Sequence, residues 1–138
     1  MTAPPRFLVT AEPLALAPLL AAVSSPAHGA VVGFLGVVRA EAGLTALTYE
    51  AYPAMAERSM AAIAAELAGR FGPLTLAAHH RVGRLAVGEV SLALAVGAPH
   101  RREACLAAAA FVDRLKEIVP IWKTVLGPGS TRDEEEGR

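Results

Sequence analysis

The chain has 138 residues, the length of one ordinary domain, and 54% of them are hydrophobic while 19% are charged. Such a chain can bury a core without disulfides or metals, so we expect a single domain over residues 1–127 and an acidic flexible tail over 128–138. Thirteen basic and thirteen acidic side chains give a formal net charge of zero. This balance argues against a broad surface for nucleic acid or anionic membrane.

The cysteine content and the N-terminus predict the compartment. The single cysteine, Cys105, excludes an internal disulfide, and a reducing cytoplasm fits best. The start "MTAPPRFLVT" lacks the apolar core of a signal peptide, and no segment is apolar for long enough to span a bilayer. We therefore expect a soluble, cytoplasmic protein. Because Cys105 lies in an Ala-rich segment, we also expect it to be a small core residue.

The first half of the chain predicts three strands and a short helix. Arg6–Thr10 is typical of a short strand, and an apolar helix is expected to begin near Pro13. His28–Arg39, rich in Val and Gly, predicts a buried strand that another backbone approaches closely. Leu44–Tyr52 alternates partly between polar and apolar residues and predicts the next strand.

A long amphipathic helix is predicted from Pro53 to Phe71. Apolar residues recur there at steps of three and four, as on one face of a helix: Ala56, Met60, Ile63, Leu67 and Phe71. Two strand-like runs, "LTLAAHHRVG" and "EVSLALAVGA", follow and predict a hairpin joined by "RLAVG". A second long helix is expected from about Pro99 to Ile118, ended by Pro120, before "IWKTVL" resumes an extended path.

These elements mix strands and helices without strict βαβ alternation. They therefore predict an α+β fold with a mixed or antiparallel sheet and two long helices. On the second helix, a core stripe is expected at helical spacing: Ala104, Ala108, Phe111, Leu115 and Ile118.

Lys116 continues a mostly apolar line beside that stripe, at the last turn of the helix. It is either a snorkelling cation at the favourable end of the helix dipole or a lysine partly desolvated against an apolar wall. Desolvation lowers the proton affinity of a lysine, as a general base or nucleophile requires. Lys123, just beyond Pro120, is either a solvated strand lysine or part of the same pocket, with Trp122 as a possible wall.

Other cationic residues are candidates for an anion site. His100 and Arg101 open the second helix, where free backbone N–H groups favour a phosphate or carboxylate. Arg39 ends a predicted strand before a glycine-containing loop. The segment "HHRVGR" has no second ligand set at a metal spacing, so we assign no metal and no cofactor.

Arg101 and Lys116 lie at opposite ends of one helix. At about 1.5 Å per residue they are on the order of 20 Å apart, too far for one small-molecule pocket on one subunit. Either they serve unrelated purposes, or a two-fold dimer brings the two ends together.

Five segments between His28 and Lys123 carry a resemblance to a known family: "GAVVGFLGVVR", "LTYEAYPAMAE", "HRVGRLAVGE", "APHRREA" and "LKEIVPIWK". In this order and spacing they resemble the large, catalytic subunit of molybdopterin synthase. The resemblance implies a hammerhead-like α+β protein that forms a homodimer. Each end of that dimer docks a small ubiquitin-like sulfur carrier ending in Gly-Gly, giving a heterotetramer.

The resemblance also implies a reaction and its residues. The carrier's thiocarboxylate donates sulfur to cyclic pyranopterin monophosphate and forms the dithiolene of molybdopterin. Lys116 is implied as the acid/base or covalent participant and Lys123 as electrostatic support. The implied substrate-binding residues are Phe34, Val37, Val38, Arg39, His100, Arg101, Thr124 and Val125.

Two alternatives remain open at this point. One is a dimeric binding module that docks the carrier without turnover, since Val37, Thr124 and Val125 depart from the family pattern. The other is an unrelated enzyme of phosphorylated metabolites that uses the same cationic cluster.

Overall fold

A computed structural model describes residues 3–41, 43–126 and 134–136. Within these residues, three helices and two four-stranded sheets form one α+β unit, which confirms the predicted fold class. The elements in chain order are β1 (Phe7–Thr10), α1 (Ala17–Val23), β2 (Ala30–Val37), β3 (Ala46–Ala51), α2 (Pro53–Phe71), β4 (Thr75–Arg81), β5 (Gly83–Ala86), β6 (Val90–Ala98), α3 (Arg101–Ile118), β7 (Ile121–Leu126) and β8 (Glu134–Glu136).

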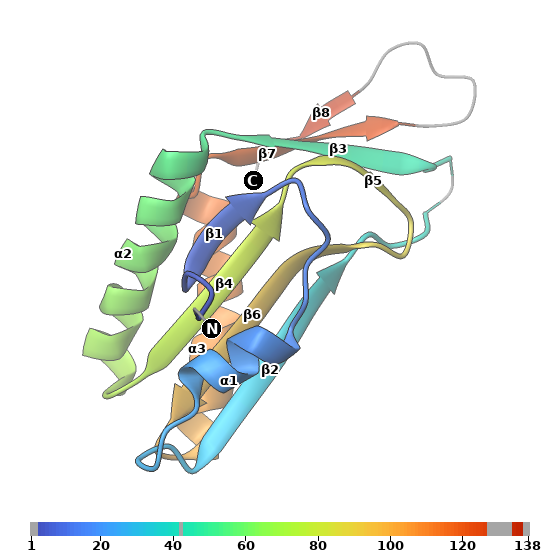
Figure 1. Ribbon diagram of the computed structural model, residues 1–138. Coiled ribbons are helices and arrows are strands. Elements are labelled where there is room, and N and C mark those ends of the chain that lie inside the picture. Colours follow the sequence, from blue (N-terminus) through green and yellow to red (C-terminus); the bar gives the residue numbers. More distant parts are fainter. Residues whose placement is uncertain (1–2, 42, 127–133, 137–138) are drawn as a thin grey trace.

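The first sheet has the strand order β1-β4-β6-β2, with β1 and β4 parallel and the other pairs antiparallel. Helix α1 lies on one face, and α3 lies on the opposite face, with α2 beside it (Figure 1). Helix α1 begins at Ala17, later than the predicted start near Pro13. Its side chains Leu19 and Val23 pack on small residues of β4 and β6, and this makes a thin second core.

The second sheet has the order β5-β3-β7-β8 and is antiparallel throughout. Strands β3 and β7 run across one end of the first sheet (Figure 1). The predicted hairpin is correct in that β4 pairs with β6. Its connection is not a simple turn, because Gly83–Ala86 leaves the first sheet and pairs with β3. Gly83 and Gly88 have φ of 99° and 93°, which lets the backbone turn sharply on both sides of β5.

The main core lies between the first sheet and the two long helices. Helix α2 has the predicted bounds and buries four of the five predicted residues, while Phe71 is half-buried. On α3, two predictions are wrong: Ile118 is 46% exposed and Cys105 is exposed. The core stripe instead includes Ala107, one turn from Ala104 and Phe111. The small alanines let α3 lie close to the sheet, so the core keeps to a narrow stripe and the flanking positions stay in solvent.

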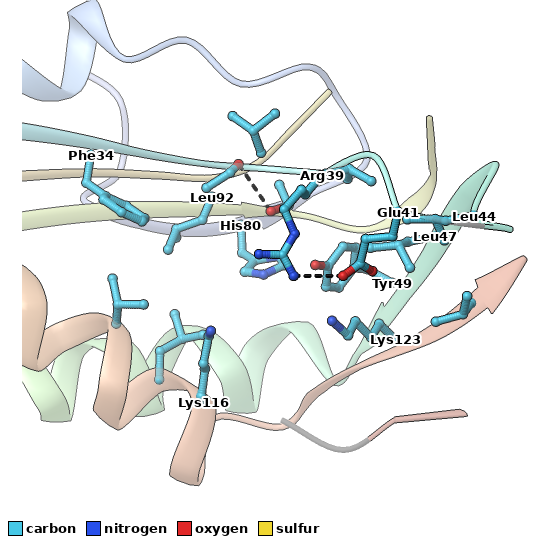
Figure 2. Close-up of a pocket in the computed structure, with 17 residues that line it drawn as sticks. Phe34, Arg39, Glu41, Leu44, Leu47, Tyr49, His80, Leu92, Lys116 and Lys123 are labelled. Carbon is cyan, nitrogen blue, oxygen red and sulfur yellow. Dashed lines mark hydrogen bonds and ion pairs between the residues drawn. The ribbon is translucent and has the colours of Figure 1, made fainter. Parts of the chain in front are cut away.

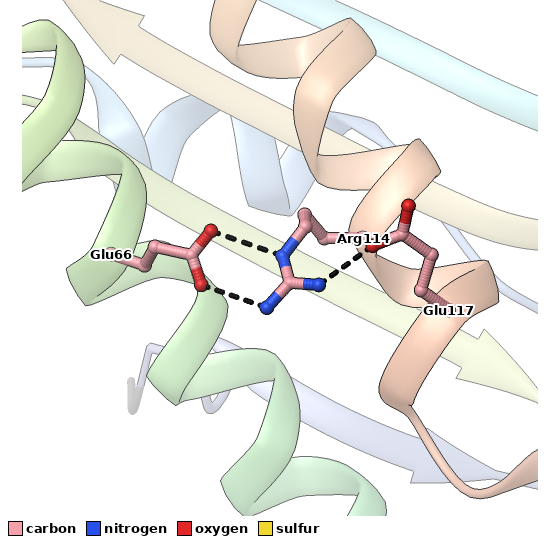
Figure 3. A network of polar contacts seen from close by, with 3 residues as sticks. All are labelled: Glu66, Arg114 and Glu117. Atoms are coloured by element: carbon pink, nitrogen blue, oxygen red, sulfur yellow. Dashed lines mark hydrogen bonds and ion pairs between the residues drawn. The ribbon is translucent and has the colours of Figure 1, made fainter.

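Arg114 joins the two long helices on their outer side. Its Nε and Nη2 donate to the two carboxylate oxygens of Glu66 on α2 at 3.0 and 3.1 Å, and its Nη1 donates to Glu117 at 2.6 Å (Figure 3). The bidentate bond to Arg114 lowers the pKa of Glu66. This network connects α2 to α3 near the end of α3 that carries Lys116.

One further prediction needs correction. The strand predicted as buried, β2, is an edge strand whose large apolar side chains are partly exposed. Within the predicted tail, Glu134–Glu136 form β8, which pairs with β7. Residues 128–133 and 137–138 of that tail lie outside the described residues.

Candidate functional site

A cavity of about 470 Å³ lies where the two sheets meet the end of α3. Its walls come from the end of β2 and the residues after it, from β3 and β7, and from the last turns of α3 (Figure 2). The volume falls within the usual range for small-molecule pockets. The elements are far apart in sequence, so only the folded chain creates the site.

Most of the residues expected at the site line this cavity. Seven of the ten do so: Phe34, Val37, Val38, Arg39, Lys116, Lys123 and Val125. Figure 2 shows the two lysines on one side of the space and the Arg39 side chain reaching into it from the other. The other three predicted residues, Thr124, His100 and Arg101, do not line the cavity.

The pleat of β7 decides which of its residues face the cavity. Successive side chains of a strand point to opposite faces. Lys123 and Val125 line the cavity, so Thr124 and Trp122 belong to the other face. The Trp122 indole N–H donates to Glu50 at 3.1 Å, and its ring lies 5.3 Å from that of Tyr52. The expectation that Trp122 walls the pocket is therefore wrong.

The two lysines differ in their surroundings. Lys116 lies in the last turn of α3 and is exposed, while Lys123 is half-buried. Val112 and Leu115 supply the apolar wall beside Lys116, but in the isolated chain this wall covers one side only. Any desolvation of Lys116 must therefore come from a bound molecule or a second chain.

The choice of lysine at these two positions stands out against the whole sequence. The chain has eleven arginines and two lysines, and both lysines line this cavity. Lysine can lose its proton when its surroundings change, whereas arginine stays charged. A site built only to attract anions would work as well with arginine. The use of lysine therefore points to chemistry in which at least one of the two supplies a transferable proton or a nucleophilic amine.

Arg39 enters the cavity in an ion pair. Its guanidinium lies 2.7 Å from a carboxylate oxygen of Glu41, and the two side chains are 81% and 54% exposed. Such an exposed pair is weak, so a phosphate group of a ligand can replace Glu41 as the partner of Arg39.

His100 and Arg101 lie at the other end of α3. His100 is the residue that precedes the helix, and Arg101 is its first residue, so Arg101 is about 22 Å along the helix from Lys116. Both side chains are exposed. Within one subunit the structure does not bring these residues to the cavity, as the helix length predicts.

Sequence reasoning missed several polar residues that line the cavity. Tyr49 of β3 and His80 of β4 are buried there, with their ring centroids 5.0 Å apart in an edge-to-face arrangement. Ser91 also lines it, and its hydroxyl donates to the Gly36 carbonyl at 3.2 Å. As a sequence pattern, the adjacent histidines suggest only metal ligands. Strand alternation, which places His79 and His80 on opposite faces, was the available signal.

The rest of the "HHRVGR" segment holds the turns around β5. Arg81 contacts Glu89 at 3.0 Å, and Glu89 accepts the backbone N–H of Ala86 at 2.7 Å. Both bonds lower the pKa of Glu89, and the bond from the Ala86 N–H has the larger effect. Arg81 and Glu89 thus act as a structural clamp behind the cavity.

Two other kinds of site are absent from the described ranges. No group of three or more His, Cys, Asp or Glu side chains is placed there to hold a metal ion. No helix among the same residues is long and apolar enough to cross a membrane. The cavity is thus the site to explain.

The fold and the cavity define a class of small α+β proteins that combine two lysines and an arginine in one pocket for an anionic substrate. The MoaE protein family matches residues 9–118 of this chain. The molybdopterin synthase catalytic subunit of Halalkalibacterium halodurans is 39% identical, over 86% of this chain and 78% of the relative. Catalytic subunit 1 from Mycobacterium tuberculosis is 40% identical, over 86% of this chain and 83% of the relative.

A solved structure agrees with these sequence matches. The crystal structure of molybdopterin synthase from Staphylococcus aureus superposes with a TM-score of 0.91 at 31% identity, covering 97% of this chain and 98% of that one. The chain therefore belongs to the MoaE family, the family of molybdopterin synthase catalytic subunits. The resemblance found in the sequence is confirmed, and with it the prediction of a molybdopterin synthase enzyme.

Proposed function

We propose that the cavity is the active site at which sulfur passes from a carrier thiocarboxylate to cyclic pyranopterin monophosphate. The observation that carries the proposal is that the only two lysines of the sequence line one cavity together with Arg39. In this reaction the thiocarboxylate sulfur forms a bond to a carbon of the pterin side chain as the C–O bond at that carbon breaks. The oxygen leaves with a proton, and the sulfur is then held as a thioester between the pterin and the carrier. Water then takes its place on the carrier's acyl carbon, and the carrier leaves as a carboxylate.

Lys116 is the acid/base or covalent participant of this proposal. It lies at the mouth of the cavity, exposed in the isolated chain, so a docked carrier tail would bury its amine against Val112 and Leu115. Burial favours the uncharged amine, which can accept a proton or attack an acyl carbon. Lys123, half-buried and deeper, stabilises the negative oxygen that develops on the acyl group.

Arg39 would bind the phosphate of the substrate. A guanidinium can donate two parallel hydrogen bonds to a phosphate. Glu41 accepts only one bond from Arg39, through a single carboxylate oxygen, so a phosphate can bind Arg39 more strongly than Glu41 does. Phe34, Val37, Val38 and Val125 supply the apolar walls against which the rest of the substrate rests. Thr124, on the other face of β7, contributes through its backbone alone.

A second copy of the chain would complete the site, and β2 is the surface that supports this. Among the described residues, β2 pairs only with β6, so the opposite edge of its eight residues is open. It contains no proline and no charged residue, the usual protections of an edge strand. Four large apolar side chains along it are between 38% and 50% exposed: Val31, Phe34, Leu35 and Val37. Such an edge is suited to pair with another strand.

Antiparallel pairing of β2 with its own copy would place the missing cations at the cavity. The strand starts beside the beginning of α3, where the Gly29 N–H donates to the Pro99 carbonyl at 3.2 Å, and it ends next to Arg39. Its length of about 23 Å matches the distance along α3 between Arg101 and Lys116. A two-fold axis through its middle thus sets His100 and Arg101 of one subunit near Arg39 and Lys116 of the other.

The complete enzyme of this proposal is a heterotetramer, with one carrier at each end of the dimer. The carrier is a small ubiquitin-like protein whose C-terminal Gly-Gly is narrow enough to enter a cavity of this size. Its chemistry is supplied by the thiocarboxylate, so the chain needs no metal of its own. We place the reaction in the cytoplasm, where a single exposed cysteine stays reduced.

The two lysines allow a test that separates charge from proton transfer. Lys116→Ala should abolish product formation from thiocarboxylated carrier and cyclic pyranopterin monophosphate, and Lys116→Arg should be equally inactive, because it keeps the charge but cannot release a proton. Lys123→Arg should retain most of the activity, since electrostatic support needs only the charge.

Size-exclusion chromatography and thermal melting of each variant serve as controls for folding and assembly. Full turnover by Lys116→Ala would overturn the proposal. Activity in Lys116→Arg but not in Lys116→Ala would reduce Lys116 to an electrostatic role.

A further inference from the structure

The floor of the cavity carries a buried aromatic pair that the family function above does not use. His80 is 3% exposed and Tyr49 is 8% exposed, and both line the cavity. His80 comes from the first sheet and Tyr49 from the second, so the pair lies where the two sheets meet. Figure 2 draws both side chains among the residues that line the cavity, together with Arg39 and Lys123.

The hydrogen bond of His80 determines which ring nitrogen carries the proton. Its Nδ1 lies 2.8 Å from the carbonyl oxygen of Arg81, and a carbonyl can only accept. Nδ1 is therefore protonated, and in the neutral ring Nε2 is the acceptor. The Tyr49 ring packs against the imidazole in a T-shaped arrangement and limits its rotation. The imidazole thus has a fixed orientation and a fixed tautomer.

The pair is connected to the lysine site through β3 and β7. Tyr49 and Lys123 are directly opposite each other in the antiparallel pair, where side chains on one face lie about 5 Å apart. Lys123, Tyr49 and His80 therefore follow one another from the lysine side of the cavity to its floor. Around them the walls are apolar, with Leu47, Leu92 and Leu115 among the lining residues.

The cavity is divided by charge. The exposed cations, Arg39 and Lys116, lie at its mouth, whereas the floor offers a buried imidazole and a phenol among leucines. A phosphate keeps part of its hydration at the mouth, and a flat heterocycle with N–H and O–H groups is suited to the floor. In apolar pockets, a few polar groups fix the orientation of such a ring.

We propose that His80 is a substrate-binding residue, which accepts a hydrogen bond at Nε2 from the pterin ring, and that Tyr49 positions it. This rests on the function proposed above, because it assigns the ring end of the same substrate. The phosphate lies toward Arg39 and the ring toward His80. His80 thereby sets which face and edge of the pterin meet the carrier's sulfur.

The neighbouring histidine provides a matched control. His79 is also buried, at 8% exposure, and its Nε2 lies 2.7 Å from the Pro5 carbonyl, but it does not line the cavity. His79→Gln keeps a donor at the Nε2 position and preserves that bond. His80→Asn keeps a donor at the Nδ1 position and preserves the bond to Arg81, while it removes Nε2 together with the outer part of the ring. Each variant thus retains its structural hydrogen bond.

The experiment measures steady-state kinetics of the complete synthase with cyclic pyranopterin monophosphate as the varied substrate. His80→Asn should raise KM about tenfold, as the loss of one buried hydrogen bond predicts, with kcat changed by about twofold or less. His79→Gln should leave both constants unchanged. His80→Gln, which restores a polar group at the Nε2 position, should recover part of the loss in KM.

Calorimetry with two probes then identifies the part of the ligand concerned. His80→Asn should weaken the binding of neopterin and of neopterin monophosphate by the same factor. Arg39→Ala should weaken the binding of the monophosphate only. An unchanged KM in folded His80→Asn, or an equal loss in His79→Gln, would overturn the assignment of His80. The function proposed above fails separately, through an active Lys116→Ala, so the two failures are distinguishable.

Discussion

Mixing two inactive variants tests whether each active site is shared between subunits. If α3 contributes Arg101 to one cavity and Lys116 to the other, Arg101→Ala and Lys116→Ala homodimers each lose both sites. In a heterodimer of the two variants, one cavity combines the intact Lys116 of the first subunit with the intact Arg101 of the second. The other cavity lacks both residues. One site of the two is therefore restored.

The expected magnitude follows from counting subunits. Random exchange of equal amounts gives about half heterodimers, and half of their sites are intact, so the mixture should recover about a quarter of the wild-type activity per site. Arg101→Ala alone should lose about ten- to hundredfold, the usual effect of removing a hydrogen bond to a charged group. The assay is product formation after the subunits are exchanged in mild denaturant and refolded together.

A matched mixture controls for nonspecific rescue. Arg101→Ala mixed with the double variant Arg101→Ala/Lys116→Ala can form no intact site and should stay inactive. Arg102→Ala, which removes the neighbouring exposed arginine, should be active by itself. If the first mixture is as inactive as its parents although heterodimers are present by native mass spectrometry, the shared site and the pairing through β2 are both refuted.

Two further predictions concern stability. Gly97→Ala places a methyl group against the Val23 carbonyl and the His28 ring. It should lower the free energy of unfolding by about 1–3 kcal/mol and Tm by roughly 3–10 °C. Gly69→Ala, which has open space around it on α2, should raise Tm slightly, and equal Tm values for the two variants would contradict the close packing of α1 on β6. The lowered pKa of Glu89 means that its contribution is present above its ordinary value of 4.5 and is lost as the pH falls through the folded value. Glu89→Gln should therefore be less stable than wild type in urea at pH 7, with the difference vanishing in acid; a gap independent of pH would show that the charge of Glu89 is not involved.

The long helices were predictable because their signals are local. The spacing of Ala56, Met60, Ile63 and Leu67 fixes the buried face of α2, and Pro53 and Gly72 mark its ends. Lys116 and Lys123 were found for a related reason: Pro120 separates them, and a helix followed by a strand brings both to one place. The resemblance supplied their roles and the structure supplied their common cavity.

The errors come from information that one segment does not contain. The valines and glycines of β2 indicate a buried strand, but whether its edge is covered depends on strand order, and in one subunit it is not. Strand β5 crosses to the other sheet because its partner β3 lies far away in sequence. The error at Thr124 could have been avoided from the sequence alone. Side chains of a strand alternate between its two faces, so if Lys123 and Val125 face the cavity, Thr124 cannot.

The residues at the floor could not have been grouped before the fold was known. Tyr49 and His80 are 31 positions apart on strands of different sheets, and each has an ordinary place in an alternating pattern. Only the crossing of the two sheets puts them in contact.

The open edge of β2 has a consequence for how the enzyme responds to its own concentration. If the strand that assembles the dimer also delivers the partner's cations, dilution that separates the subunits removes catalysis and exposes an apolar edge in the same step. A separated subunit is then both inactive and prone to aggregate, so the chain has no soluble, inactive monomeric state. Substitutions along β2 therefore act on solubility and on sulfur transfer together, and neither property can be improved there without affecting the other.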